Sequence, residues 1–128
     1  MKAVLDTHTF LWWITDQSGL SERVKEILKD KEAQLFISAV TGWEIAIKTQ
    51  LKRISLPETP PLFIPKQIRK NNFEHLPVTI LHTLAVYGLP MIHQDPFDRL
   101  LIAQARCEKI PIITKDQLIQ QYDVKVIW

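Results

Sequence analysis

The sequence predicts an α/β protein in which helices cover both faces of a mostly parallel sheet of about four to five short strands. Two observations support this fold class. Short apolar segments typical of buried strands alternate along the chain with segments in which apolar residues recur at helical spacing. The 128 residues are also 46% hydrophobic and 23% charged, as expected for one globular domain over residues 1–128. Strands that are separated by helices usually lie parallel, in a sheet that is covered on both sides.

The expected elements follow from local patterns of apolar residues, polar caps and prolines. In chain order, strands are expected at residues 3–5, 35–37, 76–78, 110–113 and 124–128, and helices at 9–14, 21–31, 64–73, 79–87, 97–109 and 117–121, with a further helix after Ser38. Residues 56–65 carry four prolines and are expected to form a loop or the entry to a helix. Pro77 makes the third strand edge-like, because proline cannot donate a hydrogen bond to a sheet.

Polar residues at the expected helix ends support these boundaries. Ser18 or Ser21 is expected to cap the helix at 21–31, and Ser38 is expected to cap the helix that follows the second strand. The apolar residues of that helix recur at the spacing of one helix face, which predicts that they face the core. They are Val40, Trp43, Ile47 and Leu51.

Composition excludes several classes of protein. The single cysteine, Cys107, rules out an internal disulfide framework and a cysteine-based zinc site, and its place within the helix at 97–109 predicts a core position. The formal net charge of +2 is too small to indicate nucleic-acid binding by itself. No apolar stretch is long enough to span a bilayer, and the N-terminus lacks the pattern of a signal peptide. We therefore expect a cytoplasmic protein without a membrane partner.

Acidic residues lie where the expected strands end or the expected helices begin. Asp6 follows the first strand, Asp98 lies near the start of the helix at 97–109, and Asp116 follows the fourth strand. Glu44 lies within the helix that follows Ser38. Because ligands bind outside the carboxyl ends of the strands in open α/β sheets, these four side chains are expected to converge.

Each acid also has an ordinary structural explanation, as a helix cap or as half of an ion pair. Asp95 followed by Pro96 has the pattern of an N-cap with proline at the first helical position, and Asp98 would then lie at the capping-box position. Glu44 precedes Lys48 by four residues, which is the favourable order for an ion pair on a helix surface. The other two acids would cap the helices that follow them.

The four acids are harder to explain as a group. Carboxylates that converge repel one another, and the repulsion raises the pKa of some of them unless a cation lies among them. Hard divalent cations such as Mg²⁺ bind carboxylate oxygens, and a pair of such ions can clamp both sides of a phosphoryl displacement. The group therefore predicts a metal site suited to phosphoryl chemistry.

Four segments of the sequence carry a family resemblance. They are VLDTH at 4–8, SAVTGWEIAIK at 38–48, HQDPFDRLLIAQA at 93–105 and ITKD at 113–116. Each segment alone is a weak signal, but all four in this order in a chain of this length are a strong one. Together they resemble the PIN-domain ribonucleases, and specifically the VapC-type toxins of type II toxin–antitoxin systems.

The resemblance implies a PIN-like three-layer α/β/α sandwich and an endoribonuclease that hydrolyses RNA phosphodiester bonds with Mg²⁺ or Mn²⁺. It implies that the metal-binding and catalytic residues are Asp6, Glu44, Asp98 and Asp116. The metal would polarise the phosphate and lower the pKa of a bound water that attacks in line, leaving a 5′-phosphate and a 3′-hydroxyl. A cognate VapB-like antitoxin would neutralise the enzyme, which would form a homodimer or a toxin–antitoxin hetero-oligomer.

Further residues within these segments have roles that the sequence leaves open. Thr114 and Ser38 would either orient carboxylates or serve as ordinary strand-end and cap hydroxyls. His8 is a candidate for contact with substrate or with a metal-bound water, and Arg99 for contact with phosphate or with a neighbouring acid. Asp95 is a candidate metal ligand as well as a helix cap.

Other residues near these segments are not assigned to the site. For His93, a contact with substrate and ordinary packing both remain open. Trp12 and Trp13 cannot both face the same way on a helix, so one of them is expected to be exposed.

Two other functions also fit the sequence. One is a PIN-domain nuclease that processes RNA without an antitoxin. The other is a non-catalytic α/β binding module or a receiver-like module, in which Lys115 would assist a phosphoacceptor aspartate. The expected third strand supplies no such aspartate, and a chain with three glycines has no glycine-rich phosphate loop.

Overall fold

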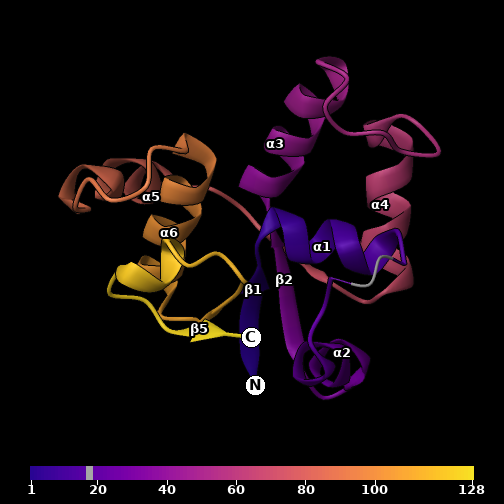
Figure 1. The fold of residues 1–128 in the computed structure, drawn as a ribbon, viewed down its shortest axis with the longest axis horizontal. Helices are drawn as coiled ribbons and strands as arrows, with labels where there is room; N and C mark the ends of the chain where they lie inside the picture. Colours follow the sequence, from indigo (N-terminus) through magenta and orange to yellow (C-terminus); the bar gives the residue numbers. More distant parts are fainter. Residues whose placement is uncertain (17–18) are drawn as a thin grey trace.

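The computed structural model describes residues 1–16 and 19–128, and strands and helices alternate along them (Figure 1). The strands are β1 (Lys2–Leu5), β2 (Gln34–Ser38), β3 (Glu74–Leu76), β4 (Ile112–Ile113) and β5 (Val126–Ile127). The helices are α1 (Thr7–Ile14), α2 (Glu22–Lys29), α3 (Ala39–Gln50), α4 (Pro60–Lys70), α5 (Ile80–Ala85) and α6 (Pro96–Glu108), with two short 3-10 helices, η1 (Val86–Gly88) and η2 (Ile119–Gln121).

The sheet has the order β3-β2-β1-β4-β5, and each neighbouring pair of strands is parallel. The chain builds the sheet outward from β1 through β2 to β3, and then crosses to the other side of β1 to add β4 and β5. The change of direction makes the carboxyl ends of β1 and β4 the topological switch point, where open α/β sheets bind their ligands. As expected, the strand next to Pro77 lies at an edge.

Side chains of alternating direction divide the core into two layers, one on each face of the sheet. Ala3 and Leu5 of β1 pack with buried residues of α1, α2 and α4. Val4, which points the other way, packs with Leu101 and Ile102 of α6. Figure 1 shows the same division, with α1, α2 and α4 on one side of β1 and β2 and with α5 and α6 on the other. The three-layer α/β/α sandwich and the parallel sheet are therefore confirmed.

The helix starts follow the polar residues that cap them. The Ser21 hydroxyl accepts a hydrogen bond from the amide of Val24, and the Ser38 hydroxyl accepts one from the amide of Val40. The other expected cap, Ser18, lies outside the described residues. Helix α4 begins at Pro60, earlier than expected, because proline is well accommodated in the first turn of a helix.

Three expectations about the core are wrong. Trp43 of α3 and Leu51, the residue directly after it, are 54% and 58% exposed, because the buried face of α3 is made by other residues, among them Ile45. The Trp43 ring packs edge-on against the Phe97 ring at the surface, with the centroids 4.8 Å apart. Cys107 is exposed on α6. Trp12 and Trp13 are both half-buried, so neither is the exposed partner that was expected. No helix of the described residues is long and apolar enough to cross a membrane.

Candidate metal centre

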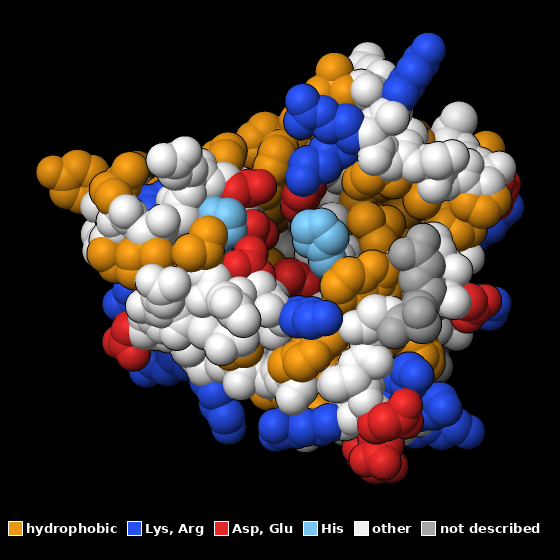
Figure 2. Space-filling model, in the orientation of Figure 1, with side chains coloured by type: hydrophobic (Ala, Val, Ile, Leu, Met, Phe, Trp, Pro, Cys, Tyr) orange, Lys and Arg blue, Asp and Glu red, His pale blue; other side chains and the backbone are white. Residues whose placement is uncertain are grey.

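The four acids that the sequence predicts all lie at the carboxyl edge of the sheet. Asp6 directly follows β1, Glu44 lies in α3, Asp98 lies in the first turn of α6, and Asp116 follows β4. Figure 2 shows acidic side chains gathered in a hollow near the middle of one face, with basic side chains at its upper rim. The charges of Glu44 and Asp6 contribute to a raised pKa at Asp98, as expected for carboxylates that converge.

Asp6 acts as a helix cap and also faces the switch point. One carboxylate oxygen, Oδ1, accepts a hydrogen bond from the amide of Thr9 at 2.9 Å and caps α1. The other oxygen, Oδ2, accepts a hydrogen bond from the hydroxyl of Thr114 at 2.5 Å. Burial raises the pKa of Asp6, and the hydrogen bonds from Thr114 and Thr9 oppose that rise. The carboxylate of Asp6 therefore has two roles, since it caps α1 and also forms part of the acid site.

Glu44 is held from both sides in a buried position. It is 3% exposed, and the Thr7 hydroxyl donates a hydrogen bond to its Oε1 at 2.6 Å. Lys48, one helical turn further along α3, forms an ion pair with its Oε2. The pair that the sequence predicts thus exists, but it lies in the site rather than on the helix surface. Lys48 brings a positive charge to the acids.

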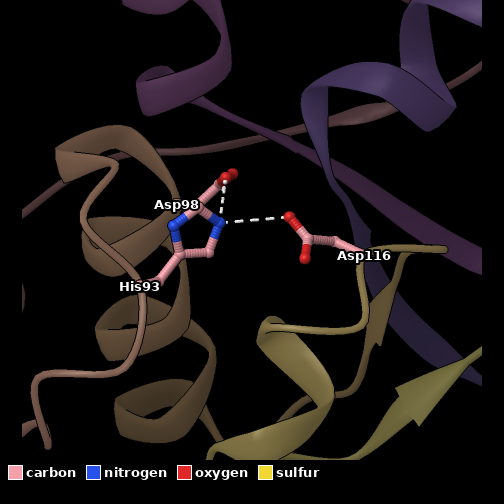
Figure 3. Close-up of side chains that lie close together, drawn as sticks. All are labelled: His93, Asp98 and Asp116. Atoms are coloured by element: carbon pink, nitrogen blue, oxygen red, sulfur yellow. Dashed lines mark hydrogen bonds and ion pairs between the residues drawn. The ribbon is translucent and has the colours of Figure 1, made fainter.

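Asp98 and Asp116 are bridged by His93, which lies in the segment before α6 (Figure 3). The Nε2 atom of His93 is 3.0 Å from Oδ2 of Asp98 and 3.1 Å from Oδ2 of Asp116. One potential ligand atom from each of these three residues lies within 4.8 Å of the other two. Burial, followed by the charges of Asp95 and Glu44, raises the pKa of Asp98 to about 7.

The hydrogen bonds of the His93 ring indicate how it acts. Its Nδ1 accepts a hydrogen bond from the amide of Asp95 at 3.2 Å, so in the neutral ring the proton lies on Nε2. The Nε2–H therefore donates a hydrogen bond to Asp116, and the same nitrogen lies beside the carboxylate of Asp98. A histidine that ligates a metal usually donates from its other ring nitrogen, which His93 does not do here. This arrangement makes His93 a donor that positions the two acids.

The segment that carries His93 is held in place by hydrogen bonds to the side chains of Tyr122 and Arg99. The His93 amide donates to the hydroxyl of Tyr122 at 2.7 Å, and the guanidinium of Arg99 donates to the same hydroxyl at 3.1 Å. Arg99 also donates to the carbonyl of Pro90 at 2.8 Å and is buried. The guanidinium is thus used inside the protein, and among the described residues it forms no ion pair with a neighbouring acid.

The remaining candidates divide between the site and its surroundings. Asp95 accepts hydrogen bonds from the amides of Phe97 and Asp98 through Oδ1 and so caps α6. Ser38 donates to Oε1 of Gln104 at 2.6 Å, which ties β2 to α6 instead of orienting a carboxylate. His8 is exposed and lines a cleft that also contains Glu44.

Sequence reasoning missed two residues of the site. Thr7 was not considered, although it lies beside Asp6 at the start of α1 and its hydroxyl reaches Glu44. His93 was left unassigned, although it precedes the cap residue Asp95 by two positions. A histidine so close to an acid-capped helix start would have been the available signal. No pattern within one segment identifies Thr7, because Glu44 lies 37 positions away in the chain.

The residues present fit a divalent cation. The candidate ligands are carboxylate oxygens from four separate segments, which is the donor chemistry that Mg²⁺ and Mn²⁺ prefer. Two of these carboxylates, Asp6 and Asp98, have raised pKa values, so the protein alone does not fully compensate their negative charge. A bound cation would supply the missing charge.

Comparisons with known proteins agree with this geometry. A family model described as PIN domain matches residues 3–125. The chain is similar in structure to VapBC2 from Rickettsia felis, solved bound to a DNA fragment from their promoter, with a TM-score of 0.74 and 13% identity over 100% of this chain and 99% of that chain. It is also similar to a toxin–antitoxin complex from Klebsiella pneumoniae, with a TM-score of 0.65 and 14% identity over 98% of this chain and 96% of that chain. A search of curated proteins gave no match.

Proposed function

The chain belongs to the PIN domain family, and from this premise we propose that it is a metal-dependent endoribonuclease toxin. One observation carries the proposal: carboxylates from four separate segments lie at the switch point of the sheet, and burial, followed by the charges of Asp95, Glu44 and Asp6, raises the pKa of Asp98. Folding alone gives no reason to collect like charges there, whereas binding a cation does.

Asp6, Glu44, Asp98 and Asp116 would hold Mg²⁺ or Mn²⁺. A bound divalent cation supplies the positive charge that stabilises a phosphodiester under attack and lowers the pKa of the attacking water. The hydroxyls of Thr114 and Thr7 orient the carboxylates of Asp6 and Glu44. His93 lies between the carboxylates of Asp98 and Asp116 and orients them in the same way.

RNA is the proposed substrate, because the four sequence segments resemble VapC-type ribonucleases. The acids alone would repel a phosphate backbone, so cations beside them are needed to admit it. Lys48 brings one such charge to the site, and Arg53 lines the cleft that also contains His8 and Glu44. Both are placed to attract phosphates that flank the cleaved bond.

A VapB-like antitoxin is the proposed partner, in a homodimer of the toxin or a toxin–antitoxin hetero-oligomer. The two similar structures are toxin–antitoxin complexes by their descriptions. The surface of this chain supports a protein partner, because hydrophobic side chains of α5 and the segment after it are strongly exposed. They are Ile80, Leu81, Leu84, Tyr87 and Met91.

A nuclease that processes RNA without an antitoxin is the second candidate. It shares the fold and the site, so the structure of this chain does not separate the two. Growth arrest on expression, relieved by co-expression of a small neighbouring reading frame, would favour the toxin. Harmless overexpression without such a neighbour would favour the processing enzyme. The match to the PIN domain family favours a nuclease over the receiver-like module that the sequence also allowed.

The first test is cleavage of an RNA of mixed structure by the wild type and by Asp6→Asn, with Mg²⁺, Mn²⁺ or EDTA. We expect cleavage that requires the metal and is lost in Asp6→Asn. Asp123→Asn is the matched control, because Asp123 is exposed and lines a different pocket. Cleavage that persists in EDTA or in Asp6→Asn would overturn the proposed site.

A further inference from the structure

A cleft of about 450 Å³ opens directly beside the acids. It is bounded by α1 on one side and by the end of α3 and the segment that follows on the other, and Glu44 forms part of its wall. This volume lies within the range of pockets that bind small ligands, roughly 300 to 1,000 Å³. Because Glu44 belongs both to the cleft and to the acid site, a ligand in the cleft would lie next to the reacting phosphate.

An aromatic and aliphatic wall forms one side of the cleft. The Trp12 ring lies with its centroid 6.1 Å from that of His8 and 6.1 Å from that of Trp128. On another side, a Cβ added at Gly19 would lie 2.7 Å from ring carbons of Trp12, so the indole lies directly against the Gly19 backbone. The indole is thus held from several directions, and Leu11 and Leu56 extend the wall.

Cations form the other side of the cleft. Lys48 is paired with Glu44, whereas Arg53 is exposed and has no ion-pair partner among residues 1–16 and 19–128. His8 is exposed on the α1 side of the cleft. Basic side chains also appear in Figure 2 at the rim of the acidic hollow. A guanidinium without a carboxylate partner is available to bind a phosphate.

We propose that this cleft binds one nucleotide of the RNA strand next to the cleaved bond, with its base against Trp12 and its phosphate at Arg53. The proposal rests on the proposed function, since the nucleotide belongs to the substrate. Aromatic and aliphatic groups, together with a cation that has no ion-pair partner among the described residues, line this one cleft and match the two parts of a nucleotide, its base and its phosphate. Trp12 and Arg53 would therefore hold the nucleotide beside the cut, Trp12 by stacking on its base and Arg53 by pairing with its phosphate.

Binding can be tested apart from cleavage. The wild-type protein is titrated in EDTA with each of the four 5′-ribonucleoside monophosphates, and amide and indole N–H resonances are followed by NMR. We expect the Trp12 indole and residues around Arg53 to shift, and Arg53→Gln to weaken binding about tenfold, as the loss of a charged contact to phosphate predicts. Arg106→Gln, an exposed arginine at a different pocket, is the control and should bind as the wild type does.

Cleavage of RNA at sub-saturating concentration then tests the contact with the base. Trp12→Leu should lower the efficiency of cleavage, kcat/KM, by about tenfold, because stacking on the indole is lost. If Trp12→Leu fails to fold, the titrations of the wild type and of Arg53→Gln still decide the question. Nucleotides that shift no resonance of the cleft, or a cleft that responds to an antitoxin peptide and to no nucleotide, would overturn the proposal. An absence of RNA cleavage together with nucleotide binding at the cleft would instead contradict the proposed nuclease and leave this binding site standing.

Discussion

The two halves of the acid site differ in what compensates their charge. In the half made by Asp6 and Glu44, both residues are 3% exposed, hydroxyls of Thr114 and Thr7 donate to their carboxylates, and Lys48 forms an ion pair with Glu44. In the half made by Asp98 and Asp116, the side chains are 18% and 31% exposed, and the Nε2 of one imidazole lies 3.0 and 3.1 Å from their carboxylate oxygens. The first half is built into strand ends and a buried helix face, whereas the second depends on a segment anchored through Tyr122.

This difference shows two ways in which the metal-free protein holds its carboxylates close together. Neutral hydroxyls orient a carboxylate without cancelling its charge, so Asp6 stays available to a cation. The His93 N–H and the Lys48 ammonium lower the repulsion among the acids. The buried half therefore sets the position of the site, and the more exposed half completes it.

The largest expected effect is the loss of cleavage when one carboxylate is removed, and its size should differ between the two halves of the site. Asp6→Asn should lower the rate of metal-dependent RNA cleavage by more than about a hundredfold, because a ligand at the centre of the site loses its charge. Asp116→Asn should cost about tenfold, since Asp116 lies at the more exposed margin. Single-turnover rates with Mn²⁺ measure both. Equal losses in the two variants would remove the distinction between the halves.

The hydroxyls of the buried half should come next in size. Thr114→Val and Thr7→Val keep the shape of each side chain and remove the donor, and each should lower cleavage by about ten- to a hundredfold, as is usual for groups that orient metal ligands. Thr49→Val is a matched control, because the Thr49 hydroxyl is buried without a hydrogen-bond partner among the described residues. Its activity should equal that of the wild type, and a comparable loss there would show that packing rather than orientation is at work.

Much of the fold was predictable because its signals are local. Apolar runs locate the strands β1, β2 and β4, and Ser21, Ser38 and Asp95 locate helix starts through hydrogen bonds that span only two or three residues. The core face of α3 was not predictable from spacing. Its apolar residues recur on one side, but Glu44 lies on the buried side because the site requires it there. Function overrides the hydrophobic pattern at this helix.

The acids of the site were predictable, but their partners were not. The carboxyl ends of parallel strands lie at the same edge of the sheet, so the placement of Asp6 and Asp116 at that edge follows from the strand pattern. The contacts of His93 with Asp116 and of Thr114 with Asp6 join residues that are 23 and 108 positions apart. Such pairings depend on which strands are neighbours in the sheet, and no single segment encodes that order.

A smaller effect should appear in the stability of the metal-free protein. The pKa of Asp98 is raised from 3.8 to about 7 in the folded state, so between these values the folded protein binds more protons than the unfolded chain. The free energy of unfolding should therefore be highest at low pH with respect to this group and fall as the pH rises from about 4 to about 7. Asp98→Asn should remove that dependence and stabilise the metal-free protein by about 1 to 3 kcal/mol at pH 8.

Thermal unfolding between pH 5 and pH 8, with EDTA or with Mn²⁺, measures this effect. Mn²⁺ should raise the midpoint of the wild type at pH 8 and have little effect on Asp98→Asn, because an ion stabilises the folded state only where its concentration exceeds its Kd. If Asp98 served only as a residue of the first helical turn, the substitution would be neutral or slightly destabilising in EDTA. That outcome would remove the electrostatic basis of the site.

The smallest expected effect tests whether the more exposed half uses its histidine as a donor or as a ligand. His93→Gln keeps an N–H near the two acids, and as the loss of a positioning group it should weaken both Mn²⁺ and Mg²⁺ binding by about tenfold. The ratio of the two affinities should stay the same, because carboxylate oxygens remain the ligands for both ions. Calorimetric titration of each ion into the wild type and the variant measures the ratio. A selective loss of Mn²⁺ binding would instead place the imidazole on the metal, because Mg²⁺ prefers oxygen ligands more strongly than Mn²⁺ does. The hydrogen bond from the Asp95 amide to Nδ1 argues for the unchanged ratio, since it keeps the ring proton on the nitrogen that faces the acids.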